Sequence, residues 1–163
     1  PTMPLNQIVG LINMDSLNIT GRKSDVRVVG FGRSGLEAFL AQAAARQHRT
    51  LSPEQHPERG YYYRSDHFSL AKKGVPALSA GGGTKPLDEA QAQIHQRVSA
   101  TVAKCYHQTC DDYSDDWGFD GMLDDLRLFF EVGYLLAQSD QWPTWSEGSE
   151  FKAARDQMMS NKK

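Results

Sequence analysis

Short apolar runs alternate along the chain with segments whose apolar residues recur at helical spacing, and this alternation restricts the fold more than any other feature. Residues 6–14 are rich in Ile, Val and Leu, as expected of a strand buried on both faces. Residues 26–31 form a second short run that ends at glycines in a predicted turn. Residues 34–48 then fit a helix with Ser34 as its N-cap. This order of strands and helices is typical of an α/β domain.

The alternation continues through the second half of the chain. Residues 65–74 predict a short helix that Ser65 caps and Gly74 ends, and residues 75–83 predict a small buried strand. Two further helices are expected later in the chain, over residues 87–103 and residues 120–139.

The last of these helices has the widest apolar face, and we expect that face to pack on the sheet. The face comprises Met122, Leu126, Phe129, Phe130, Val132, Gly133 and Leu136. Beyond it, Trp142 and Trp145 precede a short amphipathic helix and a polar tail. We therefore predict a main domain over residues 1–140 and a tryptophan-containing extension over residues 141–163.

Length and charge limit the classes of function. The 163 residues are 39% hydrophobic, which is enough for one ordinary core. The 18 basic residues nearly balance the 20 acidic ones, and the longest basic clusters are pairs, so nothing points to nucleic acid or an anionic membrane. No apolar run approaches the ~18 to 20 residues that span a bilayer. We therefore expect no nucleic-acid partner and no membrane span in this chain.

The chain begins with Pro1, which cannot be an initiator, and it enters the first predicted strand almost at once. We therefore expect that the sequence has been processed, cut or subcloned, and that upstream structure is missing. The lack of a signal-peptide pattern leaves the compartment open.

The stretch KCYHQTCDD, residues 104–112, contains the only two cysteines of the chain. A turn could bring Cys105 and Cys110 close enough for a disulfide, which is favoured over two free buried thiols and would indicate an oxidising compartment. A structural zinc site normally needs two paired clusters, and this chain has one. A thiol nucleophile activated by His107 is also less favoured, because residues two apart in a loop seldom have the required geometry.

Two further residues are candidates for chemistry. Asp15 follows the predicted strand of residues 6–14, and ligands of open α/β sheets bind at the carboxyl ends of strands. A helix N-cap or a loop hydrogen bond is the alternative for this carboxylate. His107 lies at the crown of the cysteine loop, where an ordinary surface or structural histidine is the alternative.

Three motifs together resemble one family. INMDSLN resembles the strand-end aspartate motif of two-zinc aminopeptidases, RSDHFSLAKKGVPAL resembles the next segment of that family, and CYHQTCD is similar to its Cys-Tyr-His-x-x-Cys-Asp loop. The family includes bacterial secreted leucine aminopeptidases, glutamate carboxypeptidases and the inactive transferrin receptor. The motifs occur in family order, and the resemblance covers most of residues 6–136. It implies a three-layer α/β/α fold with a mixed, mostly parallel sheet, incomplete at its N-terminal side.

The resemblance also implies roles for individual residues. Asp15 matches the carboxylate that binds one zinc ion, and His107 matches the imidazole that binds the other. Tyr106 matches a tyrosine that hydrogen-bonds the oxyanion in some members. Cys105 and Cys110 match a disulfide that braces the loop.

A second group of residues is expected around the site. Asp66 and His67 match supporting residues close to the metal ions rather than ligands. Arg64, Tyr62 and Tyr63 are expected beside the substrate pocket, with an ordinary exposed aromatic loop as the alternative.

The implied chemistry is hydrolysis of a peptide by a water shared between two zinc ions ~3.5 to 4 Å apart, with a glutamate as general base. In the family, the other ligands and this glutamate precede the strand that carries Asp15, and the chain does not contain them. We therefore expect the chain to be the C-terminal part of a zinc-dependent aminopeptidase, to bind zinc weakly alone and to be inactive alone. We also expect an exposed sheet edge, where the missing N-terminal part or a second copy would associate.

A non-catalytic binding or scaffold domain, as in the receptor branch, is the competing function. The presence of Asp15, Tyr106 and His107 favours the enzyme. An unrelated α/β domain with a chance disulfide would require three ordered motifs to arise by accident. The disulfide and the family both indicate a periplasmic or secreted protein.

Overall fold

A mixed four-stranded sheet forms the centre of the protein. The computed structural model describes residues 3–160. The strand order is β1-β4-β2-β3, with β1 at Leu11–Asn13, β4 at Ala77–Gly82, β2 at Asp25–Val29 and β3 at Thr50–Pro53. β1 and β4 are parallel, β2 and β3 are parallel, and β2 and β4 are antiparallel. The sheet is therefore mostly parallel, as predicted.

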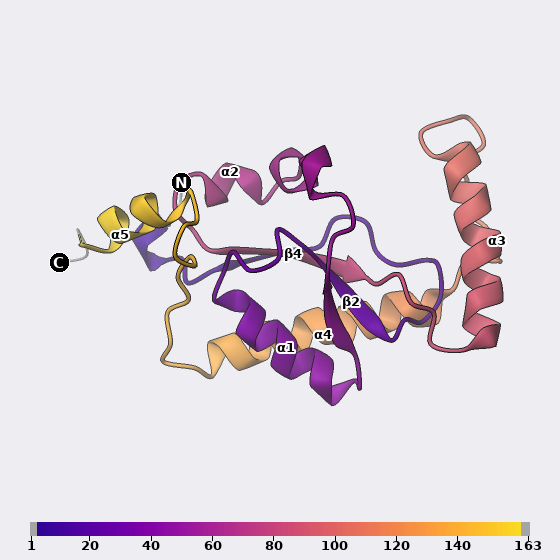
Figure 1. Ribbon diagram of the computed structural model, residues 1–163, viewed down its shortest axis with the longest axis horizontal. Helices are drawn as coiled ribbons and strands as arrows, with labels where there is room; N and C mark the ends of the chain where they lie inside the picture. The colour runs from indigo at the N-terminus through magenta and orange to yellow at the C-terminus, as the bar shows by residue number, and fades with distance from the viewer. Residues whose placement is uncertain (1–2, 161–163) are drawn as a thin grey trace.

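Two long helices cover one face of the sheet. These are α1, Leu36–Arg46, and α4, Phe119–Ala137, which lie side by side below the strands in Figure 1. The core between them and the sheet contains Val26, Val28, Leu36, Leu40, Ala43, Ala44, Leu78, Leu128 and Val132. Because successive residues of a strand face opposite sides, Arg27 lies on the other side of β2.

Shorter helices cover part of the opposite face. They are α2 at Phe68–Ala71, α5 at Lys152–Ser160, and three 3₁₀ turns, η1 at Leu5–Gln7, η2 at Pro57–Arg59 and η3 at Tyr61–Arg64. A second apolar cluster holds this layer together and contains Tyr62, Ala71, Ala77, Trp145 and Phe151. Helices on both faces make the fold a three-layer α/β/α sandwich, which confirms the predicted class.

The C-terminal segment packs tightly against this second face. The indole nitrogen of Trp145 donates to the Gly74 carbonyl oxygen at 3.0 Å. Gly74 ends α2 with a φ of 94°, and a Cβ there would lie 2.6 Å from the Arg155 backbone nitrogen, so only glycine fits. Arg155 donates to the Ile8 carbonyl at 3.2 Å, which links the two ends of the described chain. The predicted division at residue 140 remains a prediction, and its outer limits, residues 1–2 and 161–163, lie outside the described residues.

Helix α3, Glu89–Cys105, stands apart from the three layers (Figure 1). Asp88 caps its start by accepting from the Gln91 backbone N–H at 2.9 Å, as favoured at helix N-termini. Polar contacts near this end join the helix to the body: Gln91 accepts from the Arg22 backbone N–H at 2.7 Å, and the Lys23 ammonium lies 2.9 Å from His95 Nδ1. The cysteine loop follows the other end of α3.

A buried charged pair lies under the sheet. The Arg49 and Asp125 side chains are 4% and 1% exposed, and their nearest atoms are 2.8 Å apart. Neither Asp125 oxygen has a hydrogen-bond partner of good geometry within residues 3–160. Burial raises the pKa of Asp125 even though Arg49 opposes this effect.

The first strand is shorter than predicted. Residues 6–14 do not form a single strand, because η1 occupies Leu5–Gln7 and β1 contains only Leu11–Asn13. The three strand residues are half-buried rather than buried on both faces, since β1 is an edge strand of the described sheet.

Both predicted serine caps are also wrong. The N-cap of α1 is Gly35, although the Ser34 hydroxyl oxygen still accepts from the Leu36 backbone N–H at 3.2 Å. Glu37 accepts from Gly32 N–H at 2.8 Å and Arg33 N–H at 3.0 Å ahead of the helix. Ser65 does not cap α2, whose N-cap is His67, because its hydroxyl is engaged elsewhere.

The apolar face of α4 is rotated from the predicted one. Leu128, Phe129 and Val132 are buried, whereas Phe130 is 72% exposed and Leu126 is 37% exposed. Asp125 takes a buried position on this face because it pairs with Arg49. None of the helices within residues 3–160 is long and apolar enough to cross a membrane.

Candidate functional site

Asp15 lies two residues beyond the end of β1 with its carboxylate exposed and held in one orientation. The Ser65 hydroxyl donates to Asp15 Oδ2 at 3.0 Å. The same hydroxyl oxygen accepts from the Asn13 side-chain amide at 2.9 Å. Asn13, Ser65 and Asp15 therefore form a short relay between the last residue of the strand and the carboxylate. Asp15 Oδ1 has no hydrogen bond within residues 3–160 and is available to a ligand.

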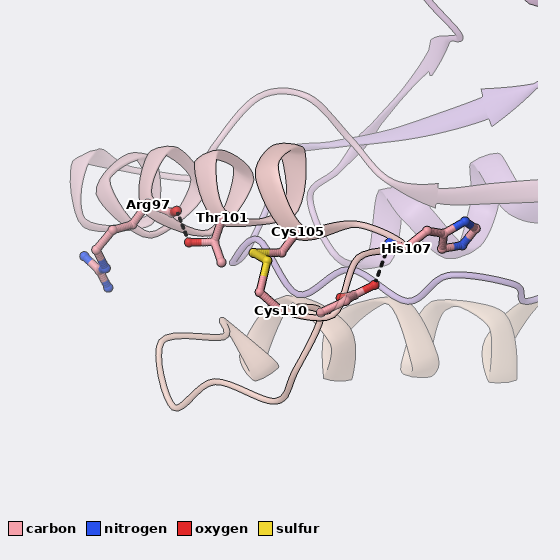
Figure 2. The surroundings of a disulfide bond; sticks show 6 residues. Arg97, Thr101, Cys105, His107 and Cys110 are labelled. Carbon is pink, nitrogen blue, oxygen red and sulfur yellow. Dashed lines mark hydrogen bonds between the residues drawn. A yellow bond between two sulfur atoms is a disulfide. The ribbon is translucent and has the colours of Figure 1, made fainter.

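The cysteine loop is closed by a disulfide between Cys105 and Cys110, whose Cα atoms are 5.1 Å apart (Figure 2). Cys105 is buried at the end of α3, so the bond fixes the loop to the helix. The disulfide prediction is confirmed, and the free-thiol, nucleophile and cysteine-zinc alternatives are wrong.

His107 is displayed by this braced loop. Its φ of 59° lies in the left-handed region, which non-glycine residues seldom adopt. The His107 backbone N–H donates to Asp111 Oδ2 at 3.0 Å, which holds this conformation. The imidazole is exposed and points away from the disulfide in Figure 2. The exposed His48 has a similar φ of 57°, so the candidate role of His107 depends on the braced loop rather than on its backbone conformation alone.

Tyr106 lies against His107. The two rings stack with centroids 3.9 Å apart and planes 20° apart, and the tyrosine is 59% exposed. The Tyr106 hydroxyl has no partner within the described chain, so it is free to donate to a substrate oxygen.

Asp15 and His107 present the atom types that zinc prefers, a carboxylate oxygen and an imidazole nitrogen. Both groups are exposed, so a metal ion could reach them. Residues 3–160 nevertheless form no group of three or more His, Cys, Asp or Glu side chains that could hold a metal ion. Each residue thus fits as a single ligand, and neither belongs to a complete site within this part of the chain.

His67 and Asp66 flank the aspartate side of the site. His67 is fully buried and lies edge-on to Tyr62, with ring centroids 4.5 Å apart. Burial lowers the pKa of His67 despite the opposing charges of Asp66 and Asp15, so the ring is neutral at pH 7. Its supporting role remains a prediction.

This burial predicts a pH dependence of stability. The pKa values of His67 and His95 are both lowered from 6.5, by burial in each case and by Lys23 as well for His95. Below about pH 6.5 the unfolded chain binds protons that the folded chain does not, so the free energy of unfolding should fall as the pH falls. The buried His67 contributes at most ~1.4 kcal/mol per pH unit.

Urea denaturation at about pH 7, 6 and 5 measures this dependence, and His95→Gln should remove the part due to His95. Asp25 contributes little over this range, because its pKa is lowered. Asp125 acts in the opposite direction, because burial raises its pKa, so the part due to His95 is taken from the difference between His95→Gln and the parent protein. The same pH dependence of the free energy of unfolding in both proteins would contradict the assignment to His95.

The residues predicted beside a substrate pocket lie in different environments. Tyr62 is only 3% exposed, so the exposed-loop alternative is wrong for it, and burial raises its pKa. The Tyr63 hydroxyl donates to Glu150 Oε1 at 2.6 Å. Arg64 is exposed, with its guanidinium carbon 4.8 Å from the Tyr61 ring centroid. Their pocket role remains a prediction.

Ser65 is the residue that sequence reasoning missed. Its place at the start of the RSDH motif suggested a helix cap, whereas its hydroxyl contacts a residue 50 positions earlier. Asp66 and His67, which follow Ser65 in the motif, were the signal that the segment has a function beyond starting a helix.

A comparison with family models gives a match over residues 1–128 to the model described as peptidase family M28. The match includes all three motifs together with Asp15 and His107. Comparisons with curated proteins and with solved structures give no match.

Proposed function

The chain belongs to peptidase family M28, a family of metallopeptidases, and on that basis we propose that it is part of a zinc-dependent aminopeptidase in which Asp15 and His107 each bind one of two zinc ions. The observation that supports the proposal most directly is that Asp15 and His107 are both exposed and held in place by other residues. Asp15 is oriented by Ser65, and His107 is displayed by a disulfide-braced loop.

The two ions would lower the pKa of a shared water and polarise the scissile carbonyl. The residues of this chain would position the ions and the substrate oxygen. Asp15 would supply a carboxylate oxygen in a fixed orientation, and His107 would supply an imidazole nitrogen. The Tyr106 hydroxyl, which stacks beside that donor, would donate to the developing oxyanion.

Two ligands do not complete such a site, because a catalytic zinc ion takes three protein ligands. We propose that the other ligands and the general base come from residues outside 3–160, and that the chain alone binds zinc weakly and is inactive. The surface for that association would include the edge of β1 that has no neighbouring strand in the described sheet, and a second copy that uses the same edge is the alternative.

Release of a chromogenic amine from aminoacyl substrates tests the proposal. The assay compares the protein expressed from its complete gene with the isolated chain. We expect activity only from the former, abolished by a chelator and restored by zinc. Chelator-sensitive activity of the isolated chain would contradict the shared site. A folded complete protein with neither activity nor bound zinc would support the binding or scaffold alternative.

Ser65 should set the zinc affinity of Asp15. Residues that orient metal ligands typically change affinity by about 10- to 100-fold when removed. We expect Ser65→Ala in the complete protein to weaken zinc binding by about tenfold in competition with a fluorescent chelator, and Ser65→Thr, which keeps the hydroxyl, to restore it. Equal affinities for Ser65→Ala and the parent protein would show that Ser65 does not position Asp15.

We also propose that the protein acts in the periplasm or outside the cell. The Cys105–Cys110 disulfide supports this, because disulfides persist in oxidising compartments.

A further inference from the structure

Three arginines surround Tyr61 on the face of the sheet that carries η3. Arg59 donates to the Tyr61 hydroxyl at 3.4 Å, and the Arg64 guanidinium carbon lies 4.8 Å from the ring centroid. Arg27 projects from β2 on the same side and also acts on this tyrosine. Arg27, Arg59 and Arg64 are called the arginine cluster below. All three are exposed.

The arginine cluster lies next to the candidate metal ligand. Arg64 is bonded through the chain to Ser65, whose hydroxyl holds Asp15. The backbone of the cluster is therefore directly linked to the residue that orients Asp15.

The cluster is unusual because its positive charges lack partners. None of the ion pairs within residues 3–160 includes a member of the cluster. By contrast, six arginines outside the cluster each have a carboxylate within 4.0 Å: Arg22, Arg33, Arg46, Arg49, Arg97 and Arg127. Glu58, the residue before Arg59, acts on it, so this carboxylate offsets one of the three positive charges. The cluster therefore carries an excess of positive charge.

The positive charge of the cluster lowers the pKa of one tyrosine, Tyr61. The pKa of Tyr61 is lowered, first by the hydrogen bond from Arg59 and then by the charges of Arg59, Arg64 and Arg27. Arg59 and Arg64 both contact Tyr61, so this residue marks the centre of the cluster.

We propose that the arginine cluster binds a carboxylate of the peptide substrate, so that the enzyme prefers peptides with an anionic group near the scissile bond. This inference rests on the proposed peptidase function. The planar guanidinium presents paired N–H donors that match the two oxygens of a carboxylate. The carboxylate could come from an acidic side chain or from the free C-terminus of a short peptide.

Three small probes separate these sources. N-acetylglutamic acid α-amide has only a side-chain carboxylate, N-acetylglutamine has only an α-carboxylate, and N-acetylglutamine α-amide has neither. Their dissociation constants are measured by NMR titration of the chain, with the ring of Tyr61 as the reporter. We expect one or both anionic probes to bind about fivefold or more tightly than the neutral probe at low salt, and added salt to reduce the difference.

Variants and a second readout assign the effect to the cluster. Arg64→Met should weaken binding of the anionic probe about threefold to tenfold, whereas Arg127→Met, which removes a 74% exposed arginine of α4, should leave it unchanged. A bound carboxylate should also raise the pKa of Tyr61 in a spectroscopic titration, with Tyr61→Phe as the reference. Equal binding of all three probes, or an equal effect of both arginine variants, would overturn the inference.

Hydrolysis by the complete protein separates this inference from the proposed function. Higher kcat/KM for the substrate with the preferred carboxylate than for its amide supports both. Equal kcat/KM for the two, with no selective binding, overturns the cluster and leaves the peptidase. Selective binding with no hydrolysis of any substrate supports the anion site and overturns the peptidase.

Discussion

Replacement of His107 with alanine is expected to lower kcat/KM of the complete protein for aminoacyl substrates by more than ~100-fold. Loss of a residue that only orients a metal ligand costs about 10- to 100-fold, and loss of the ligand itself should cost more. The fold should remain intact, because the side chain is exposed and the histidine ring makes no hydrogen bond within residues 3–160. The measurement pairs steady-state kinetics with the zinc content of the purified protein.

Glycine at the same position distinguishes the loss of the metal ligand from the backbone strain that alanine would introduce. His107 has a φ of 59°, which costs an alanine but not a glycine about 1 kcal/mol. His107→Gly should therefore lose as much activity as His107→Ala while unfolding at a higher urea concentration than His107→Ala. His48→Gly removes another exposed histidine with a similar backbone conformation and serves as the control with unchanged activity. Full activity in either His107 variant would exclude this residue as a ligand.

The largest effect on stability is expected at Asp125. Its removal leaves the Arg49 guanidinium, which is 4% exposed, without an opposite charge. Breaking a buried pair in this way typically costs about 3 to 5 kcal/mol. Asp125→Ala should lower the free energy of unfolding by that amount in urea denaturation. The m-value, the slope of this free energy against urea concentration, should stay the same.

Two controls test the explanation. Asp124 forms a partly exposed pair with Arg22, so Asp124→Ala should cost about 1 kcal/mol or less. The double variant Arg49→Met, Asp125→Leu should recover most of the loss, because both charges are then absent and apolar groups fill the space. If the double variant is as unstable as Asp125→Ala, lost packing rather than an unpaired charge is the cause.

The sequence predicted the class of fold because alternating apolar runs and helical segments carry that information locally. It predicted the positions of α1, α3 and α4 for the same reason. The predicted buried face of α4 was wrong, since Asp125 occupies a buried position that only its partner Arg49 explains. That pairing joins residues 76 positions apart and leaves no local pattern.

The site was predictable to a similar extent. The cysteine loop follows from residues that are close in sequence, and its disulfide was found. The role of Ser65 depends on a contact across the fold, and a serine ahead of a short helix has the same local pattern whether it caps the helix or holds Asp15. The burial of Tyr62 also depends on a distant partner, because Phe151 and Trp145 arrive from the C-terminal segment.

Because α3 stands apart from the three layers, a small change in its angle would move His107, which lies just beyond its C-terminal end. The contact between Lys23 and His95 lies 10 residues before Cys105, the last residue of α3, a separation of about 15 Å along a helix that rises 1.5 Å per residue. A rotation of about 5° at that contact would move the end of the helix by about 1.3 Å, and misplacement by ~1 Å can cost a hundredfold in rate. The position of His107 therefore depends on how firmly the contacts of α3 hold its angle, which include Lys23 with His95, the ion pair of Arg97 with Asp116 and the buried Val98.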